Sequence, residues 1–440
     1  MKKLITIFLL LLSAANISGY SISSFQQDSV WTLEKCIDYA LEKNIQVRKS
    51  ELSNRTSVLY AEQATAQRFP SLGASVNQNF DWSRNNGSAL RSSNGTSYSI
   101  NSGVTLFNYS RITNLIRQAN LDIQSGNYSL EATKESISLN ILNAFLQVLY
   151  AEEQVNNSRK QIESTESQLN LAGERLALQV ISQADYAQVK SQLASEKLTL
   201  ANSESQLAIA KVNLMQLMEL PVTADFNISH PDLGETVNQN RIPDVSKVYE
   251  TALAIKPQIR AAEVNKEIAS LDDNIARAAY FPVLSANAGV STSYADRTAD
   301  PYFTQLNDYL RPGIGLSLSV PIYQKKQAKT NVAVAKINYE NAELSEIDTR
   351  NQLRKDIEQA CQDVISAQIE YVASSEKYQA TLESSALSEE KFTQGIINSV
   401  DYLVSKTNLI VSESQLLQSK YNLIFSYKVL DFYMGIPFSL

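Results

Sequence analysis

The sequence has few of the residues that usually carry chemistry. Its 440 residues include one histidine and two cysteines, with only 13 glycines and 10 prolines. It has no phosphate-binding glycine loop and no carboxylate pair flanked by a positioning group, so too few groups remain for catalysis. We therefore expect no enzymatic activity, no metal site and no cofactor.

The two cysteines, Cys36 and Cys361, lie in different helical segments without metal-ligand spacing. We expect two small core residues. A disulfide bond between them is the alternative in an oxidising compartment.

The N-terminus resembles a secretory signal peptide over residues 1–20. Lys2 and Lys3 precede an apolar run from Leu4 to Leu12, and small residues follow. Its removal would change the net charge from −7 to −9, because two lysines are lost. An acidic mature protein argues against nucleic acid as a partner. No later apolar run reaches the roughly 18 residues of a membrane-spanning helix, so strands must make any membrane crossing.

The stretch from 110 to 220 lacks proline, which breaks helices. An apolar heptad track runs through it, followed by a second track from Tyr186 onward. The first track is Ile141, Val148, Val155, Ile162, Leu169 and Leu176. This pattern predicts a coiled-coil hairpin of two long helices, the first about 100 Å long at about 1.5 Å per residue.

The same pattern returns 216 residues later, where Ile141 corresponds to Ile357 and Met218 to Met434. A repeat of this length indicates two copies of one large unit. We assign the first copy to 31–221, with a helix, strands at 71–83 and 97–107, and the hairpin at 110–220. The second copy is 247–437, with a helix, strands at 283–294 and 312–322, and the hairpin at 326–436. A linker, 222–246, contains the single histidine, His230.

The four predicted strands alternate between apolar and small polar residues. In the fourth, Ile314, Leu316 and Leu318 alternate with Gly315 and Ser317. Segments of about ten residues with this alternation are typical of a transmembrane β-barrel. The alternative for any one strand is a soluble hairpin with one buried face. Polar loops are expected at 84–94 and 295–310.

Four strands cannot close a barrel, and an open sheet edge cannot persist in lipid. Two chains would supply 8 strands, whose interior side chains fill, whereas three would supply 12 and leave a channel. A conducting protein would therefore be a trimer. The rival interpretation is an exported coiled-coil scaffold or adaptor protein with no membrane barrel.

The duplicated strand and helix hairpins resemble the TolC family of outer membrane factors. Local signatures support this resemblance: Phe69-Pro70 and Phe281-Pro282 before each first strand, an aromatic at Phe107 and Tyr323 after each second strand, and the turn at 395–401. The resemblance covers the chain from Trp31 to Pro437.

The resemblance implies a mixed, mainly α fold. A homotrimer would form a 12-stranded transmembrane β-barrel in the outer membrane of a Gram-negative bacterium, continuous with a periplasmic α-barrel. It also implies a passive exit duct for a tripartite efflux pump or a type I secretion system. The implied partners are outer membrane lipid, a periplasmic adaptor protein and an inner membrane pump of the RND or ABC type. Selectivity for the exported substrate would lie mainly in the pump.

The candidate pore gate lies at the two helix-helix turns. Asp185 and Asp401 occupy equivalent positions, three residues after Ser182 and Asn398 respectively. An acid at this position caps a helix, and capping alone would account for both residues.

In the TolC family, the residue matching Asp401 rings the pore at its closed tip. Val404 and Ile397 replace a second aspartate and an arginine found in other members. We therefore expect a gate with one acidic ring and apolar contacts of Ile181, Ile397 and Phe392.

Six aromatic residues near the strand ends are candidates for interfacial girdles in the membrane. They are Phe80, Trp82, Tyr98, Phe107, Tyr294 and Tyr323. Ordinary strand packing is the alternative.

Overall fold

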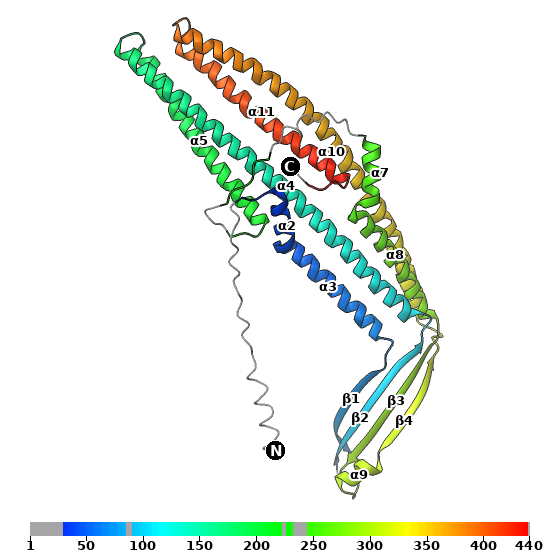
Figure 1. Cartoon of the computed structure of the whole chain (residues 1–440). Helices are drawn as coiled ribbons and strands as arrows, with labels where there is room; N and C mark the ends of the chain where they lie inside the picture. The colour runs from blue at the N-terminus through cyan, green and yellow to red at the C-terminus, as the bar shows by residue number, and fades with distance from the viewer. Residues whose placement is uncertain (1–29, 85–89, 222–225, 232–243, 439–440) are drawn as a thin grey trace.

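The computed structural model describes residues 30–84, 90–221, 226–231 and 244–438. The segment interpreted as a signal peptide and most of the 222–246 linker lie outside the described residues. The molecule is elongated, with a β-sheet at one end and the tips of two helical hairpins at the other (Figure 1). The mainly helical fold expected from the sequence is confirmed.

The sheet contains four antiparallel strands in the order β1-β2-β3-β4. They are β1 (Ser71–Ser83), β2 (Arg91–Phe107), β3 (Val283–Ala295) and β4 (Arg311–Ser319). Strands β1 and β4 therefore form its two edges. This order places the two copies side by side, joined where β2 pairs with β3.

Two strand boundaries differ from the predictions by more than one residue. Strand β2 begins at Arg91 rather than 97, because the polar residues before 97 continue the backbone ladder with β1. Strand β4 ends at Ser319 rather than 322, and Pro321 nearby has no N–H for a ladder. In addition, part of the loop expected at 295–310 is a short helix, α9 (Tyr302–Asp308).

Each copy has one helical hairpin, and the two hairpins have matching lengths. Helices α4 (Arg111–Ala177) and α10 (Gln327–Thr393) each contain 67 residues. Their partners α5 (Gln183–Leu217) and α11 (Ser399–Tyr433) each contain 35 residues. Each long helix therefore runs past its partner and continues toward the sheet (Figure 1).

The helix expected in each copy before its first strand is two helices. In the first copy, α2 (Leu33–Lys43) and α3 (Ile45–Ala66) meet at Asn44. The Asn44 side chain accepts a hydrogen bond from Gln46 N at 2.8 Å and donates one to Leu217 O at 2.8 Å. Asparagine side chains compete with helical hydrogen bonds in this way, so two helices form where a single helix was predicted.

The equivalent helices of the second copy are α7 (Val245–Ile255) and α8 (Pro257–Arg277). Pro257 at the start of α8 lacks an N–H and separates the two helices. Helix α8 contacts both α4 and α10, whereas its counterpart α3 packs on α4. The two copies therefore have different neighbours within one chain.

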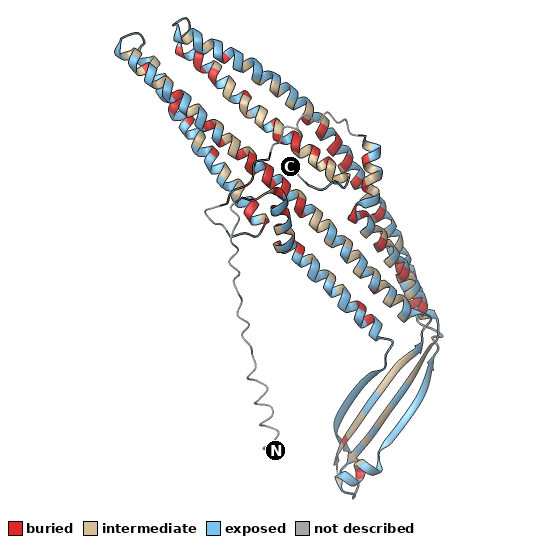
Figure 2. Ribbon diagram, viewed as in Figure 1, coloured by how far each residue is buried: buried red, intermediate tan, exposed pale blue. Residues whose placement is uncertain are grey.

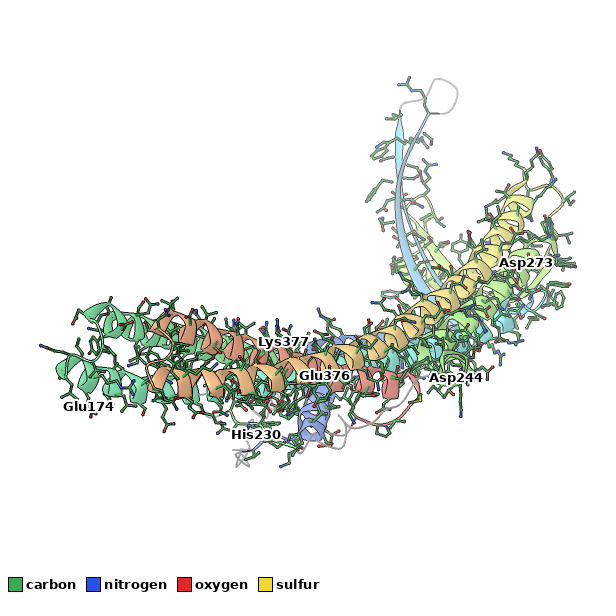
Figure 3. All side chains as sticks on the ribbon, turned by 90° about the horizontal axis from the view of Figure 1, so that it is seen from above. Glu174, His230, Asp244, Asp273, Glu376 and Lys377 are labelled. Carbon is green, nitrogen blue, oxygen red and sulfur yellow. The ribbon has the colours of Figure 1, made fainter. Side chains whose placement is uncertain are left out.

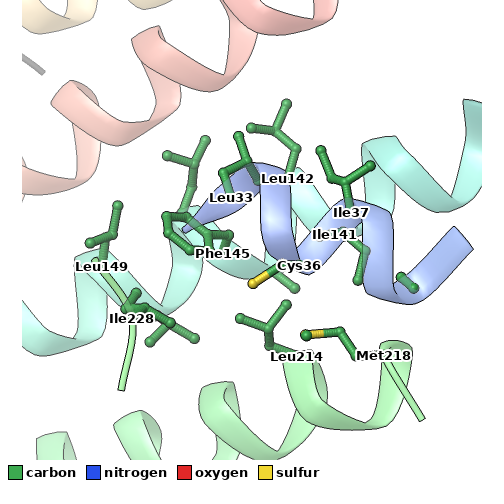
Figure 4. Packing of buried hydrophobic residues seen from close by; sticks show 14 of the residues in the cluster. Leu33, Cys36, Ile37, Ile141, Leu142, Phe145, Leu149, Leu214, Met218 and Ile228 are labelled. Atoms are coloured by element: carbon green, nitrogen blue, oxygen red, sulfur yellow. The ribbon is translucent and has the colours of Figure 1, made fainter. Parts of the chain in front are cut away.

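The main core lies at the middle of the molecule, where α2 packs on α4 and α5 (Figure 4). Phe145, Ile141 and Leu214 are completely buried there. Burying each such side chain contributes about 1.5–3 kcal/mol. A second cluster joins α7, α10 and α11. Burial is densest in this region and sparse on the sheet (Figure 2).

Both cysteines are buried and free, in different clusters. Their assignment as small core residues is confirmed, and the alternative of a disulfide bond is wrong. Burial raises the pKa of the Cys36 thiol to about 12 and also raises the pKa of Cys361. Neither thiol is therefore reactive at neutral pH.

Candidate functional site: the helical tip and the sheet face

The residues expected at the gate lie at the helical tips, at the opposite end from the sheet (Figure 1). Ser182 caps α5, and its Oγ accepts a hydrogen bond from Asp185 N at 3.1 Å. Asp185 Oδ2 accepts in turn from Ser182 N at 3.2 Å and from Ser182 Oγ at 2.7 Å. This arrangement is a capping box, which satisfies free backbone donors at a helix start.

Asp185 also joins the two hairpins of the chain. Its Oδ1 accepts a hydrogen bond from the Ser399 hydroxyl of α11 at 2.6 Å. The hydrogen bonds from Ser399 and then Ser182 lower the pKa of the Asp185 carboxyl. At the same level, Arg175 Nη2 donates to Thr393 O at 3.1 Å and so connects α4 to α10.

Asp401 is placed differently from its equivalent. Its backbone N donates to Asn398 Oδ1 at 2.8 Å, which caps α11, while its side chain is exposed. Capping accounts for the position of Asp401 in the helix, and its carboxylate faces solvent in the single chain. The two aspartates therefore differ, because only Asp185 is tied to the other hairpin by a described hydrogen bond.

The apolar gate candidates are divided between surface and interior. Val404 is 56% exposed, and Ile181 and Ile397 are partly buried. Phe392 stacks on Tyr402, with ring centroids 4.9 Å apart and an interplanar angle of 10°. Phe392 is therefore packed within its own hairpin in this structure.

A buried charged pair near the tip was missed by the sequence analysis. Lys406 of α11 is 4% exposed and Glu196 of α5 is 6% exposed, and Lys406 Nζ lies 3.6 Å from Glu196 Oε1. Lys406 Nζ also donates to Thr165 Oγ1 and, at 3.4 Å, to Gln168 Oε1, both on α4. One lysine therefore ties α11 to both helices of the other hairpin.

This pair is electrostatically costly. Burial lowers the pKa of Lys406, although the Glu196 charge opposes that effect. Glu196 Oε2 has no hydrogen-bond partner among the described residues. The available sequence signal was the position of Lys406, four residues after Tyr402 and three before Leu409 on the heptad track.

The described part of the linker lies on the side of the helices. Ile228 forms a parallel β-bridge with Trp31, and His230 Nε2 lies 2.8 Å from Glu152 Oε2 of α4. Figure 3 shows His230 beside the middle of the long helices, far from Glu174 near the tip. His230 is therefore separate from the tip.

The two faces of the sheet have opposite character. Large apolar side chains on one face are exposed, including Ile314 at 91% and Leu72 at 78%. The other face carries small polar residues, and Ser75 Oγ lies 2.7 Å from Ser99 Oγ. We call the first the apolar face. Alternation with a period of two along each strand produces this separation.

Four of the six expected girdle aromatics are exposed, namely Phe80 at 60%, Trp82 at 64%, Phe107 at 52% and Tyr323 at 82%. Tyr98 and Tyr294 are only partly exposed. Both contact Tyr302 of α9, with 2.5 Å between the Tyr98 and Tyr302 hydroxyls and 4.9 Å between the Tyr294 and Tyr302 rings. Phe303 of the same helix is 81% exposed, and the sequence analysis had not singled it out.

None of the helices described here is long and apolar enough to cross a membrane.

A model of the outer membrane efflux protein family matches this chain twice, over residues 36–219 and 248–435. The chain belongs to the outer membrane efflux protein family. The two matches correspond to the two copies of the duplicated unit. The family consists of channels of the outer membrane and is not a class of enzymes. Its TolC-like fold agrees with the resemblance inferred from the sequence.

Curated relatives of this efflux family member are distant. It is 26% identical over 208 residues to the pyoverdine export outer membrane protein OpmQ of Pseudomonas aeruginosa, which covers 47% of this chain and 42% of OpmQ. It is 21% identical over 321 residues to an uncharacterized protein of Haemophilus influenzae, which covers 71% of this chain and 66% of that protein. The alignments thus span less than two thirds of either relative.

Solved structures share the fold over almost the whole chain. The CmeC outer membrane channel of Campylobacter jejuni aligns with a TM-score of 0.75 at 17% identity, covering 92% of this chain and 85% of CmeC. The open state of the MtrE outer membrane channel of Neisseria gonorrhoeae aligns with a TM-score of 0.71 at 20% identity, covering 92% and 89%. This family member therefore has the helical and strand architecture of an outer membrane channel.

Proposed function

We propose that the protein is a homotrimeric outer membrane channel and serves as the passive exit duct of a tripartite efflux pump or a type I secretion system. The observation that carries this proposal is that equivalent surfaces of the two repeat copies are buried in one copy and exposed in the other. The sheet shows it first, since β1 and β4 are edge strands with unpaired backbone groups. Such edges need partners in lipid.

The helices show the same mismatch. Leu52 and Leu59 of α3 are 62% and 59% exposed, whereas their equivalents in α8, Val264 and Leu271, are 9% and 5% exposed. The difference arises because α8 lies between α4 and α10, whereas α3 packs on α4. The uncovered side of α3 therefore fits α10 of a second copy.

The matching surface lies on α10. Ile337 and Leu344 are 55% and 63% exposed. Their equivalents on α4, Leu121 and Tyr128, are partly buried, and α4 packs against α8. The exposed sides of α3 and α10 in one chain thus carry complementary surfaces. A head-to-tail interface of this kind forms a ring when its rotation closes.

Three copies suit a duct better than two. Three would supply 12 strands and leave an aqueous channel, whereas the interior of an 8-stranded barrel is filled by side chains. In the trimer, the small polar residues opposite the apolar face would line the channel. We expect no selective substrate site in this chain, because an inner membrane pump of the RND or ABC type would choose the cargo.

The helical tip is the proposed gate. Asp401 and Val404, exposed in the single chain, would face the pore with their equivalents from the other copies, and Asp185, Ile181, Ile397 and Phe392 would support the turns. A periplasmic adaptor protein would dock at the tip and open it. The name of OpmQ, a pyoverdine export protein, supports export as the activity.

The test is the mass and conductance of the detergent-purified mature protein. We expect three chains per particle by native mass spectrometry and ion conductance in planar bilayers. The rival function, an exported coiled-coil scaffold without a barrel, requires a single copy that remains monodisperse in buffer without detergent. That result would contradict the proposal.

A further inference from the structure

Helix α9 lies in the connection between β3 and β4. That part of the second copy, from Pro282 to Tyr323, is four residues longer than the equivalent part of the first copy, from Pro70 to Phe107. The proposed duct gives this helix no role. In Figure 1 it lies at the end of the sheet that is farthest from the helices.

Helix α9 packs on the apolar face of the sheet. Tyr98 pairs with Thr292, and two residues further along these strands Ile100 pairs with Val290, so all four side chains share one face. Thr292 Oγ1 donates to Leu306 O at 2.6 Å, and the Tyr98 hydroxyl contacts that of Tyr302. Helix α9 therefore covers the outer end of the face that would contact lipid.

A buried glutamine fixes this helix to the strand. Gln305 is 1% exposed, and its Nε2 donates to Asp300 O at 2.7 Å. Its Oε1 accepts from Ala295 N, at the end of β3, at 2.9 Å. A buried amide with both ends satisfied holds one orientation, because losing either bond leaves an unpaired polar group. Helix α9 is therefore fixed to the sheet through its own side chain.

The outer surface of α9 is aromatic and apolar. Phe303 is 81% exposed, Leu310 just after the helix is 53% exposed, and Tyr309 is 36% exposed. The Phe303 ring packs edge-on against Tyr302 at 5.4 Å, which leaves the rest of the ring uncovered. Next along the same face of the sheet, Ile314 at 91% and Leu316 at 72% are also uncovered. Exposed apolar side chains thus occur both on α9 and on the apolar face of β4, the strand that follows it.

We propose that α9 is an interfacial helix of the outer leaflet, with Phe303 inserted among the lipid chains just below the headgroups. The proposal rests on the proposed function, since it requires the sheet to cross the membrane. Its support is that α9 packs on the apolar face, where Phe303 is exposed, and that α9 contacts this face at Thr292, just beyond the apolar Val290. Aromatic side chains favour this depth. Helix α9 then helps to fix how deeply the outer end of the channel sits in the bilayer.

The experiment uses the full mature protein, reconstituted in phospholipid vesicles, with one introduced cysteine carrying an environment-sensitive fluorophore. The variants are Phe303→Cys on the proposed lipid side, Asp308→Cys as an exposed control on another face of the same helix, and Ile314→Cys as a control on the sheet. Both native thiols are buried, so the label reacts at the introduced site. Quenching is measured with a lipid nitroxide placed near the headgroups and, separately, with aqueous iodide.

We expect the lipid nitroxide to quench the label at 303 at least several-fold more than iodide does, with the opposite ratio at 308. Iodide quenching at 303, with lipid quenching at 314, would overturn the interfacial helix while leaving the membrane-spanning sheet intact. Iodide quenching at both 303 and 314 would instead overturn the proposed function itself.

Discussion

The Ser399 hydroxyl donates a hydrogen bond to Asp185 Oδ1 at 2.6 Å, and so joins the first turn of α11 to the first turn of α5. These turns belong to different hairpins of the same chain. The contact holds the two halves of the proposed gate together at its tip. Opening that separates the hairpins would have to break it.

We expect Ser399→Ala to open the tip more often. A hydrogen bond to a charged group that is partly exposed contributes roughly 1 kcal/mol, so the open fraction should rise about fivefold. The measurement is spontaneous opening in planar bilayers. Gln183→Ala, at the equivalent position of the first copy, is the matched control and should behave like the wild type. Equal effects of the two variants would show that the Ser399 bond has no special role.

The same bond predicts a dependence on pH. The Ser399 and Ser182 hydrogen bonds lower the Asp185 pKa while the two hairpins are joined at the tip. Their stabilisation is therefore present above the ordinary aspartate pKa of about 4 and is lost as pH falls through the lowered value. Ser399→Ala raises the Asp185 pKa toward its ordinary value, so the opening of this variant should increase less on acidification than that of the wild type. The measurement is open probability across the acidic range, and coincident wild-type and variant curves would exclude this link.

Lys406→Met should strongly destabilise the helical region, because it leaves the Glu196 carboxylate buried without its cation. Breaking a buried ion pair costs about 3–5 kcal/mol. The double variant Lys406→Met with Glu196→Met should recover most of the loss, since no charge stays buried. Thermal unfolding followed by circular dichroism measures both.

Lys190→Met is the matched control for this pair. Lys190 is equivalent to Lys406 in the first copy but is exposed, so its change should stay within about 0.5 kcal/mol. A double variant as unstable as Lys406→Met alone would show that the charge is not the cause.

The repeat predicts the register between neighbouring chains. Asn101 of β2 pairs with Gly289 of β3 within one chain. In the repeat, Asn101 corresponds to Ser317 of β4, and Gly289 corresponds to Asn77 of β1. Ser317 should therefore pair with Asn77 of the neighbouring chain. The double variant Ser317→Cys with Asn77→Cys should therefore form disulfide-linked chains on oxidation in the membrane.

Ser317→Cys with Ser75→Cys keeps the same face but shifts the register by two residues, and should link far less. Non-reducing electrophoresis measures both variants. Preferential linkage at 75 would reject this register while retaining the ring.

Asp401→Asn tests the acidic ring at the tip. The Asp401 carboxylate is exposed in the single chain, so removing its charge should lower cation preference and weaken block by multivalent cations. Asp185→Asn should have a smaller effect on ion selectivity, because that carboxylate is engaged by Ser182 and Ser399. Unchanged selectivity in Asp401→Asn would argue for a gate of apolar contacts alone.

The repeating elements could be read directly from the sequence. Alternation along residues such as Ile314, Leu316 and Leu318 determines the face of a strand, and the heptad track through Ile141 determines the buried side of a helix. These signals are local and periodic, so they survive without tertiary information. For the same reason the capping interactions of Asp185 and Asp401 were predictable.

The remaining features depend on contacts between distant segments. Asn44 divides a helix partly through a bond to Leu217 O, which lies far away in the sequence. Helix α9 depends on Gln305 and contacts Tyr98 and Tyr294, which the sequence had offered only as candidate girdle residues. Lys406 is buried because Glu196, Thr165 and Gln168 meet it from another hairpin. No local pattern specifies such partners.

The Lys406–Glu196 pair occurs once per chain, because the residue equivalent to Glu196 in the second copy is Ser412. A closed ring of three chains would consequently alternate three joints fastened by buried charge with three joints that lack it. The contact between the two hairpins of one chain would therefore be stiffer than the contact between neighbouring chains. Widening of the ring at the level of Lys406 would therefore begin between subunits, whereas opening of the extreme tip also requires the Ser399–Asp185 bond to break.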